Sequence, residues 1–202
     1  MNYPRFFDEV RRIHTRDRLA ELLGSCEGGL IEYGYTDAVR LAGHSCPTVA
    51  GAYLVTLRAL ERLFPDGPAE RGGVRVHFRD ALEDGVTGVI ANVIGLLTGA
   101  AAEGGFKGLG GRHVRCDLQR FSVRIPAAIR FERMADGRAV CVDYHPEHVP
   151  AAPRMRELLV CIMAGSASDA DRREFGMLWQ DRVRRILVDG IDDDSLVVMK
   201  EP

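Results

Sequence analysis

A histidine and a cysteine, His44 and Cys46, lie two residues apart in the segment Gly43-His44-Ser45-Cys46-Pro47. Over residues 48–64 the apolar side chains recur at the three- and four-residue spacing of an amphipathic helix. Pro47 suits the first position of that helix, because the N–H that proline lacks would have no partner there. The sequence therefore predicts that Cys46 lies at a helix N-terminus, where the helix dipole and free N–H groups favour a thiolate.

Two kinds of chemistry fit this pair. His44 and Cys46 are both ligands for zinc or another divalent transition metal, which takes about four donors in a structural site and three in a catalytic one. Alternatively, Cys46 is the activated thiol nucleophile of a metal-free enzyme. His44 is awkwardly placed to act as its general base, because it lies on the same turn. A structural interpretation also stays open, in which His44 caps a turn and Cys46 packs inside.

A metal shell needs further donors, and the candidates are spread along the chain: His14, Cys26, His77, His113 and Cys116. His113 and Cys116 have a spacing that is compatible with a chelate. Cys141 and Cys161 lie in apolar runs, so we expect both to be small buried side chains. His145 and His148 lie in a Pro-containing linker, where we expect exposed side chains without a function.

The glycine-rich stretch over residues 104–112 contains Lys107 and Arg112. Backbone N–H groups and these two cations could bind an anionic substrate, with Arg79 or Asp80 as further orienting groups. The stretch lacks the Gly-Lys-Ser/Thr of a Walker A motif, and it follows a helix instead of a strand. We therefore favour a flexible loop close to the metal site over a nucleotide cradle.

Composition bounds the class of protein. The chain has 202 residues, 46% of them hydrophobic, and a formal net charge of −2, which supports a sizeable core and gives no electrostatic footprint for nucleic acid. No apolar run approaches the roughly 18 residues of a membrane span, and the N-terminus lacks the pattern of a signal peptide. The five cysteines are odd in number and scattered, so we expect reduced thiols in a cytoplasmic protein.

The elements that position these residues follow from periodicity and turn residues. Helices are predicted at residues 6–23, 47–64, about 84–98, with Asp84 as N-cap, and 154–163, and another starts after Ser168, which forms a capping box with Asp171. Strands are predicted at 30–35 and 74–78, with two or three more over 117–144. The result is an α+β fold with a mixed, largely antiparallel sheet packed with helices. Residues 1–150 form the metal-binding domain, and residues 151–202 form a C-terminal helical extension packed on it.

The segment Gly43–Pro47 resembles the opening Gly-His-x-Cys-Pro signature of the FmdE family, which is named for a component of formylmethanofuran dehydrogenase. A second similarity is the helix end Leu97-Thr98-Gly99, followed by the loop Gly105-Phe106-Lys107-Gly108. The resemblance covers roughly residues 35–121, which is more than a third of the chain. It implies an α+β domain, commonly a homodimer, that binds zinc through the His-x-Cys signature.

From the resemblance only His44 and Cys46 carry over as metal ligands. The family often has a cysteine at the position of Ala100 and another near Gly88 and Val89, so the shell here must be completed differently. The family's cysteine-rich zinc ribbon is also absent from this sequence. The resemblance implies an accessory or small-molecule-binding protein of C1 or molybdoenzyme-related metabolism, and a partner subunit that is an oxidoreductase. Whether the protein is itself an enzyme stays open.

Overall fold

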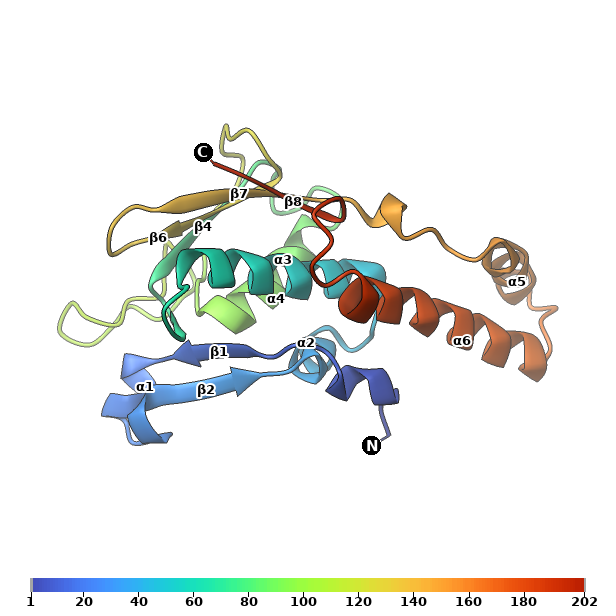
Figure 1. Cartoon of the computed structure of the whole chain (residues 1–202), viewed down its shortest axis with the longest axis horizontal. Helices are drawn as coiled ribbons and strands as arrows, with labels where there is room; N and C mark the ends of the chain where they lie inside the picture. The colour runs from blue at the N-terminus through green and yellow to red at the C-terminus, as the bar shows by residue number, and fades with distance from the viewer. Residues whose placement is uncertain (1, 202) are drawn as a thin grey trace.

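The structure is a computed structural model that describes residues 2–201. These residues form three layers (Figure 1), in which the two central helices α3 (Pro47–Leu63) and α4 (Thr87–Thr98) lie between two sheets. The larger sheet has the strand order β5-β4-β6-β7-β8 and the smaller one β2-β1-β3. Most strand pairs are antiparallel, which confirms the predicted α+β class.

The larger sheet is built around β4 (Val74–Phe78). On one side of β4, the strands β6 (Ile129–Arg133), β7 (Ala139–Tyr144) and β8 (Val197–Lys200) follow in this order, each antiparallel to the strand before it. On the other side, β5 (Gln119–Arg120) is parallel to β4. The predicted strand at 74–78 is confirmed, as are strands within residues 117–144, where β6 and β7 form an antiparallel hairpin. Strand β8 lies within residues 151–202, for which only helices are predicted.

The predicted helix over residues 6–23 is wrong. The segment forms a 3-10 turn η1 (Arg5–Asp8), strand β1 (Ile13–Arg16) and a five-residue helix α1 (Arg18–Leu22). Strand β1 pairs with β2 (Leu30–Tyr33) and with β3 (Ala69–Glu70). Ile13 and Thr15 are buried and alternate with exposed neighbours, because successive side chains of a strand point to opposite faces of the sheet. Both residues are β-branched and fit a half-buried strand better than a helix.

Two helices lead into and out of the His-Cys segment. Helix α2 (Tyr35–Ala42) is not among the predicted elements; its first residue is buried, and it ends at Gly43 in the left-handed conformation, with φ 76°. The predicted helix from Pro47 is confirmed as α3, with proline in its first turn and Cys46 at its N-cap. Gly43 has no Cβ, so it closes α2 without the strain that another residue would meet there.

The second central helix starts later than predicted. Val86 is the N-cap residue of α4, and Gly99 ends it with φ 75°, as expected. Asp84 instead accepts the backbone N–H of Thr87 through its carbonyl and that of Ala81 through its carboxylate. The Asp84 side chain therefore stabilises the turn before the helix and does not cap the helix itself.

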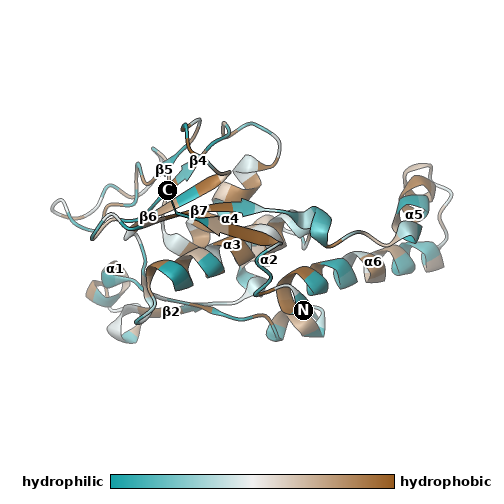
Figure 2. Cartoon of the chain, turned by 45° about the horizontal axis from the view of Figure 1, so that its top comes forward, coloured by the Kyte–Doolittle hydropathy of each residue, from teal (hydrophilic) through white to brown (hydrophobic). Residues whose placement is uncertain are grey.

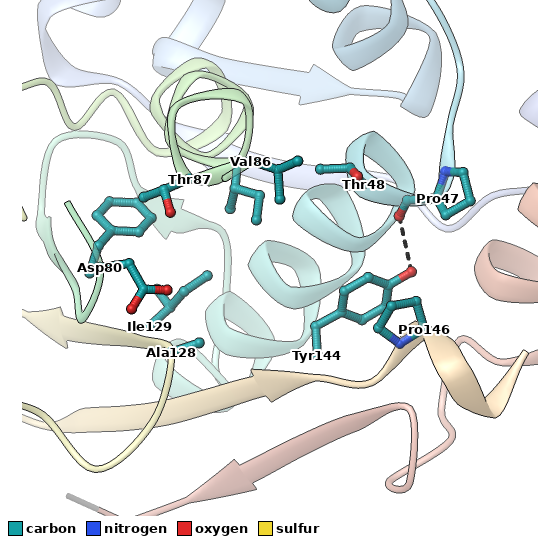
Figure 3. Close-up of a pocket in the computed structure, with 11 residues that line it drawn as sticks. Pro47, Thr48, Asp80, Val86, Thr87, Ala128, Ile129, Tyr144 and Pro146 are labelled. Carbon is teal, nitrogen blue, oxygen red and sulfur yellow. Dashed lines mark hydrogen bonds between the residues drawn. The ribbon is translucent and has the colours of Figure 1, made fainter. Parts of the chain in front are cut away.

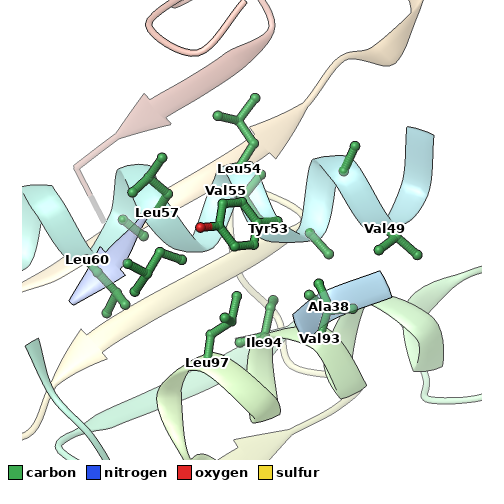
Figure 4. Close-up of a cluster of buried hydrophobic side chains, with 14 of the residues drawn as sticks. Ala38, Val49, Tyr53, Leu54, Val55, Leu57, Leu60, Val93, Ile94 and Leu97 are labelled. Carbon is green, nitrogen blue, oxygen red and sulfur yellow. The ribbon is translucent and has the colours of Figure 1, made fainter. Parts of the chain in front are cut away.

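The core lies between the helices and the larger sheet. In Figure 4, Ile94 and Leu97 of α4 point toward α3, while Leu54 of α3 points to the strands. All three side chains are fully buried. Each fully buried side chain of this size stabilises the fold by about 1.5–3 kcal/mol, so α3, covered on both sides, is the element on which the layers pack.

The C-terminal helices α5 (Pro153–Met163) and α6 (Asp169–Arg184) form a hairpin, here called the C-terminal arm, that projects from the layered body (Figures 1 and 2). The predicted capping box of Ser168 and Asp171 is confirmed. Cys141 is buried as predicted, but the prediction for Cys161 is wrong. Cys161 lies on α5, where the arm's outer end is not covered by the body. Among residues 2–201, no helix has the length and apolar character needed to cross a bilayer.

Candidate functional site

The thiol of Cys46 is turned into the protein at the start of α3. Its Sγ accepts the backbone N–H of Val49 at 3.5 Å, and the residue is 9% exposed. Serine, threonine, aspartate or asparagine usually supplies this N-cap acceptor, and sulfur is a weaker one. The prediction that Cys46 lies at a helix N-terminus is therefore confirmed, and its sulfur satisfies one free N–H group of the helix.

The imidazole of His44 is exposed to solvent. Its Nδ1 lies 3.0 Å from the carbonyl oxygen of Ala42. A carbonyl only accepts hydrogen bonds, so Nδ1 carries the proton and Nε2 keeps the lone pair in the neutral ring. His44 thus offers its Nε2 outward, whereas Cys46 offers its thiol to the interior.

Ser45, between the two residues, is fixed by the C-terminal arm. Its Oγ donates to Oε1 of Gln180 at 3.0 Å, and its carbonyl accepts the indole N–H of Trp179 at 2.9 Å. The hydroxyl of Tyr35 lies 3.0 Å from the same Oγ and, because Ser45 donates to Gln180, it is the donor. Burial raises the pKa of Tyr35, which keeps this hydroxyl protonated. Nothing in the sequence indicated this contact, because Ser45 and Gln180 are 135 positions apart.

The other predicted metal donors lie on separate elements. His14 is on β1, Cys26 in the connection between α1 and β2, His77 on β4, and His113 and Cys116 in the loop after α4. Burial, followed by the charge of Arg130, lowers the pKa of His77, which favours its neutral form. Among residues 2–201, no group of three or more His, Cys, Asp or Glu side chains is placed to hold a metal ion.

The number and type of donors that this chain offers can be compared with those that zinc needs. His44 and Cys46 supply one nitrogen and one sulfur, both of types that zinc accepts. Two donors are fewer than the three of a catalytic site or the four of a structural one. Within one chain, the described residues do not fit a complete zinc shell, and we derive no chemical step through a metal.

Lys107 and Arg112 lie at the other end of the molecule from His44 and Cys46. Figure 1 shows their loop, yellow-green, at the end opposite the C-terminal arm. Both side chains are exposed. The loop is pinned there by Arg115, which donates to Oδ1 of Asp17 at 2.7 Å. The structure does not bring the two cations to the His-Cys segment.

A cavity of about 260 Å³ opens beside the N-terminus of α3 (Figure 3). The cavity is lined by residues at the starts of α3 and α4, in the larger sheet and in its connections. These eleven residues are Pro47, Thr48, Phe78, Asp80, Val86, Thr87, Ile90, Ala128, Ile129, Tyr144 and Pro146. Most of the wall is apolar. Figure 3 shows Asp80 and Thr87 on one side and Thr48 and Tyr144 on the other. Polar groups at opposite edges of an apolar wall are typical of small-molecule sites.

The hydroxyl of Tyr144 donates to the carbonyl of Pro47 at 3.0 Å and so joins the larger sheet to the start of α3. Its ring lies against Gly51, where a Cβ would overlap it. Burial raises the pKa of Tyr144, so it stays a donor at neutral pH. The sequence does not indicate this cavity, because its wall comes from five separate segments. Two lining residues could have pointed to it. Thr48 directly follows the Gly43–Pro47 segment, and Asp80 was considered as a group that orients a substrate.

No model of a known protein family matches this sequence, and no curated protein matches it.

Proposed function

We propose that this chain is an FmdE-like small-molecule-binding protein whose ligand occupies the cavity beside the N-terminus of α3. The observation that carries the proposal is the concave apolar wall with a few polar groups at its edge. At about 260 Å³ the cavity is slightly smaller than the usual ligand sites of about 300–1,000 Å³, which restricts the ligand to a small molecule. Pro47, the last residue of the Gly43–Pro47 segment, is part of the cavity wall.

The wall also indicates the chemistry of the ligand. Phe78, Ile90 and Ile129 offer an apolar surface for a ring or short aliphatic body. Asp80 is the ionisable carboxylate of the wall, and the side chain is about half exposed (52%). Nε of Arg79 lies 3.4 Å from Oδ1 of Asp80 and offsets part of its charge. A hydroxyl, amide or ammonium group on the ligand would find acceptors at this carboxylate, and its remaining negative charge disfavours a carboxylate on the ligand. The proposed ligand class is a neutral or cationic small molecule with an apolar body.

The role of His44 and Cys46 in zinc binding stays a prediction, with the thiol nucleophile as its alternative. A closed shell would need donors from a second copy of the chain or from a ligand, because this chain supplies two. The nucleophile alternative needs a base, and the structure gives no hydrogen bond between His44 and the thiol of Cys46. Elemental analysis of the purified protein and its Cys46→Ser variant separates the two, since equal metal content in both excludes zinc at Cys46.

The proposed homodimer is supported by exposed apolar side chains on the C-terminal arm. Val160, Met163 and Met177 are 63%, 78% and 68% exposed. Mass measurement by light scattering on the parent and on Met163→Glu tests it, with Leu23→Glu, just after α1, as the control. A partner subunit that is an oxidoreductase stays a prediction. The free state of all five cysteines supports a reducing compartment, and we propose the cytoplasm.

The cavity proposal is tested by filling the cavity. Ile90 lines it, whereas Val89, its neighbour on α4, does not line it and is 38% exposed. Saturation-transfer NMR with benzyl alcohol is expected to detect binding to the parent and to Val89→Trp, and none to Ile90→Trp. Equal signals for the two variants would contradict binding in the cavity. Circular dichroism establishes that both variants are folded.

A further inference from the structure

His145 and His148 share one face of a short turn between β7 and the C-terminal arm. The turn is the 3-10 segment η3 (Pro146–His148), with His145 as its N-cap residue. In a 3-10 turn the side chains at positions i and i+3 lie above one another. The two imidazole rings accordingly have their centres 5.8 Å apart.

The hydrogen bonds of His148 fix which of its nitrogens carries the proton. Its Nδ1 lies 3.0 Å from Oγ of Ser195, and that hydroxyl donates its single proton to Oδ1 of Asp193 at 2.7 Å. Ser195 must therefore accept from His148, which places the proton on Nδ1. The neutral ring then keeps its lone pair on Nε2.

His145 also carries its proton on Nδ1, but its hydrogen-bond partner is different. Its Nδ1 lies 2.9 Å from Oε1 of Glu147. An ionised carboxylate only accepts hydrogen bonds, so Nδ1 of His145 donates and Nε2 holds the lone pair. A histidine that binds a metal commonly has this arrangement, in which the other ring nitrogen donates to a carboxylate or a polar oxygen.

The backbone of the turn is held on both sides. The N–H of His145 donates to the carbonyl of Leu196 at 2.9 Å, which ties the turn to the segment before β8. Arg182 of α6 donates to the carbonyls of Pro146, at 3.0 Å, and Val149, at 2.7 Å. The two rings are therefore presented from a fixed support.

We propose that His145 and His148 form a binding site for a divalent transition-metal ion, coordinated through the two Nε2 atoms. Neutral imidazoles suit Zn²⁺, Cu²⁺ and Ni²⁺. An ion bound at about 2.1 Å from a ring nitrogen lies about 3 Å from that ring's centre, so two rings on one ion have centres within about 6 Å of each other. No third protein donor joins the pair among residues 2–201, so water or a small ligand fills the remaining positions.

Titration calorimetry with Ni²⁺ tests the site on the full chain in the Cys46→Ser background, which removes the sulfur of the other candidate metal site. Changing either His145 or His148 to Gln is expected to weaken Ni²⁺ binding more than tenfold. Changing Ser195 to Ala is expected to weaken it by about tenfold or more, as for other partners that orient a ligand. The matched control is His14→Gln, an exposed histidine on β1 beside Glu32, which is expected to leave binding unchanged.

Electron paramagnetic resonance with Cu²⁺ counts the nitrogens directly. Two equivalent nitrogen couplings in the Cys46→Ser background, and one in each single variant, are expected. Ni²⁺ binding that survives the loss of either histidine, or that falls equally in His14→Gln, overturns the proposal. Benzyl alcohol binding to the same variants is expected to be unchanged, so this site and the cavity can fail separately.

Discussion

The indole N–H of Trp179 donates a 2.9 Å hydrogen bond to the backbone carbonyl of Ser45, the residue between His44 and Cys46. Helix α6 thus holds the turn that presents both candidate site residues. Gln180, the next residue of the helix, accepts a hydrogen bond from the hydroxyl of the same serine. The C-terminal arm therefore contributes to the site's geometry although it lies outside the region that resembles the FmdE family.

Replacing Trp179 with Phe is expected to loosen the His-Cys turn. The variant leaves the carbonyl of Ser45 without its strongest donor, at a cost of about 1–3 kcal/mol if water does not replace it. The thiol of Cys46 should then react faster with a disulfide reagent than in the parent. Met177→Ala, at an exposed position on the same helix, is the control, and an unchanged rate at Cys46 in Trp179→Phe would contradict the role of α6.

Glycine-to-alanine changes at two helical positions are expected to have opposite effects. At Gly51 in α3 a new Cβ overlaps the ring of Tyr144, whereas at Gly176 in α6 it meets nothing within 4 Å. Gly51→Ala should destabilise the protein by about 1–3 kcal/mol through overpacking. Gly176→Ala should stabilise it by about 0.5–1 kcal/mol, because alanine loses less conformational entropy in a helix. Urea unfolding measures both, and a neutral Gly51→Ala would show that Tyr144 is free to move.

Asp17 is expected to make stability depend on pH in the acid range. Burial alone would raise its pKa, but the hydrogen bond from Arg71 and the charge of Arg115 outweigh it and lower the pKa. The carboxylate's contribution is therefore complete above its unfolded pKa of about 3.9 and is lost as the pH falls through the lower folded value. Unfolding free energies measured from pH 6 to pH 2.5 should fall over this window.

Asp17→Asn should lose about 3–5 kcal/mol at neutral pH, because both arginines then lack a buried counter-charge. The same variant should show a smaller change in stability between pH 4.5 and pH 2.5 than the parent. Glu32→Gln, which removes an exposed ion pair with Arg12, is the control. A pH dependence as steep in Asp17→Asn as in the parent would assign the acid sensitivity to other carboxylates.

The charge of Asp80 is expected to select among ligands that share one apolar body. Benzylamine and benzyl alcohol should bind to the parent more tightly than benzoate, since benzoate meets the carboxylate's repulsion. In Asp80→Asn the gap between benzylamine and benzoate should narrow by about threefold or more, and benzyl alcohol should change least. NMR titrations provide the affinities. Tighter binding of benzoate than of benzylamine by the parent would contradict the proposed ligand class.

The elements that carried strong local signals are the ones that the sequence predicted well. Pro47 at the start of α3 and Gly99 at the end of α4 are determined by backbone chemistry that acts within one turn. The first predicted helix is wrong because Phe7, Val10 and Ile13 fit a helical spacing, yet Ile13 belongs to a strand whose backbone pairs with β2. Strand β8 likewise depends on its long-range pairing with β7.

In the candidate site too, the features set by the local sequence are predicted, and those set by tertiary contacts are not. The N-cap position of Cys46 follows from the local sequence and is confirmed, whereas the cavity joins residues from Pro47 to Pro146 and has no local signature. The glycine-rich stretch predicts a flexible loop with Lys107 and Arg112 close to the metal site, but nothing in its local sequence determines where that loop lies. Tertiary contacts of Arg115 with Asp17 hold their loop elsewhere.

Isoleucine methyl NMR during a benzyl alcohol titration tests the proposed binding cavity most directly. The methyl resonances of Ile90 and Ile129, which line the cavity, should shift together and saturate with one affinity. Those of Ile31 on β2 and Ile162 on α5 should stay in place. Shifts confined to isoleucines outside the cavity, or no saturable shift at Ile90 and Ile129, would contradict ligand binding beside the start of α3.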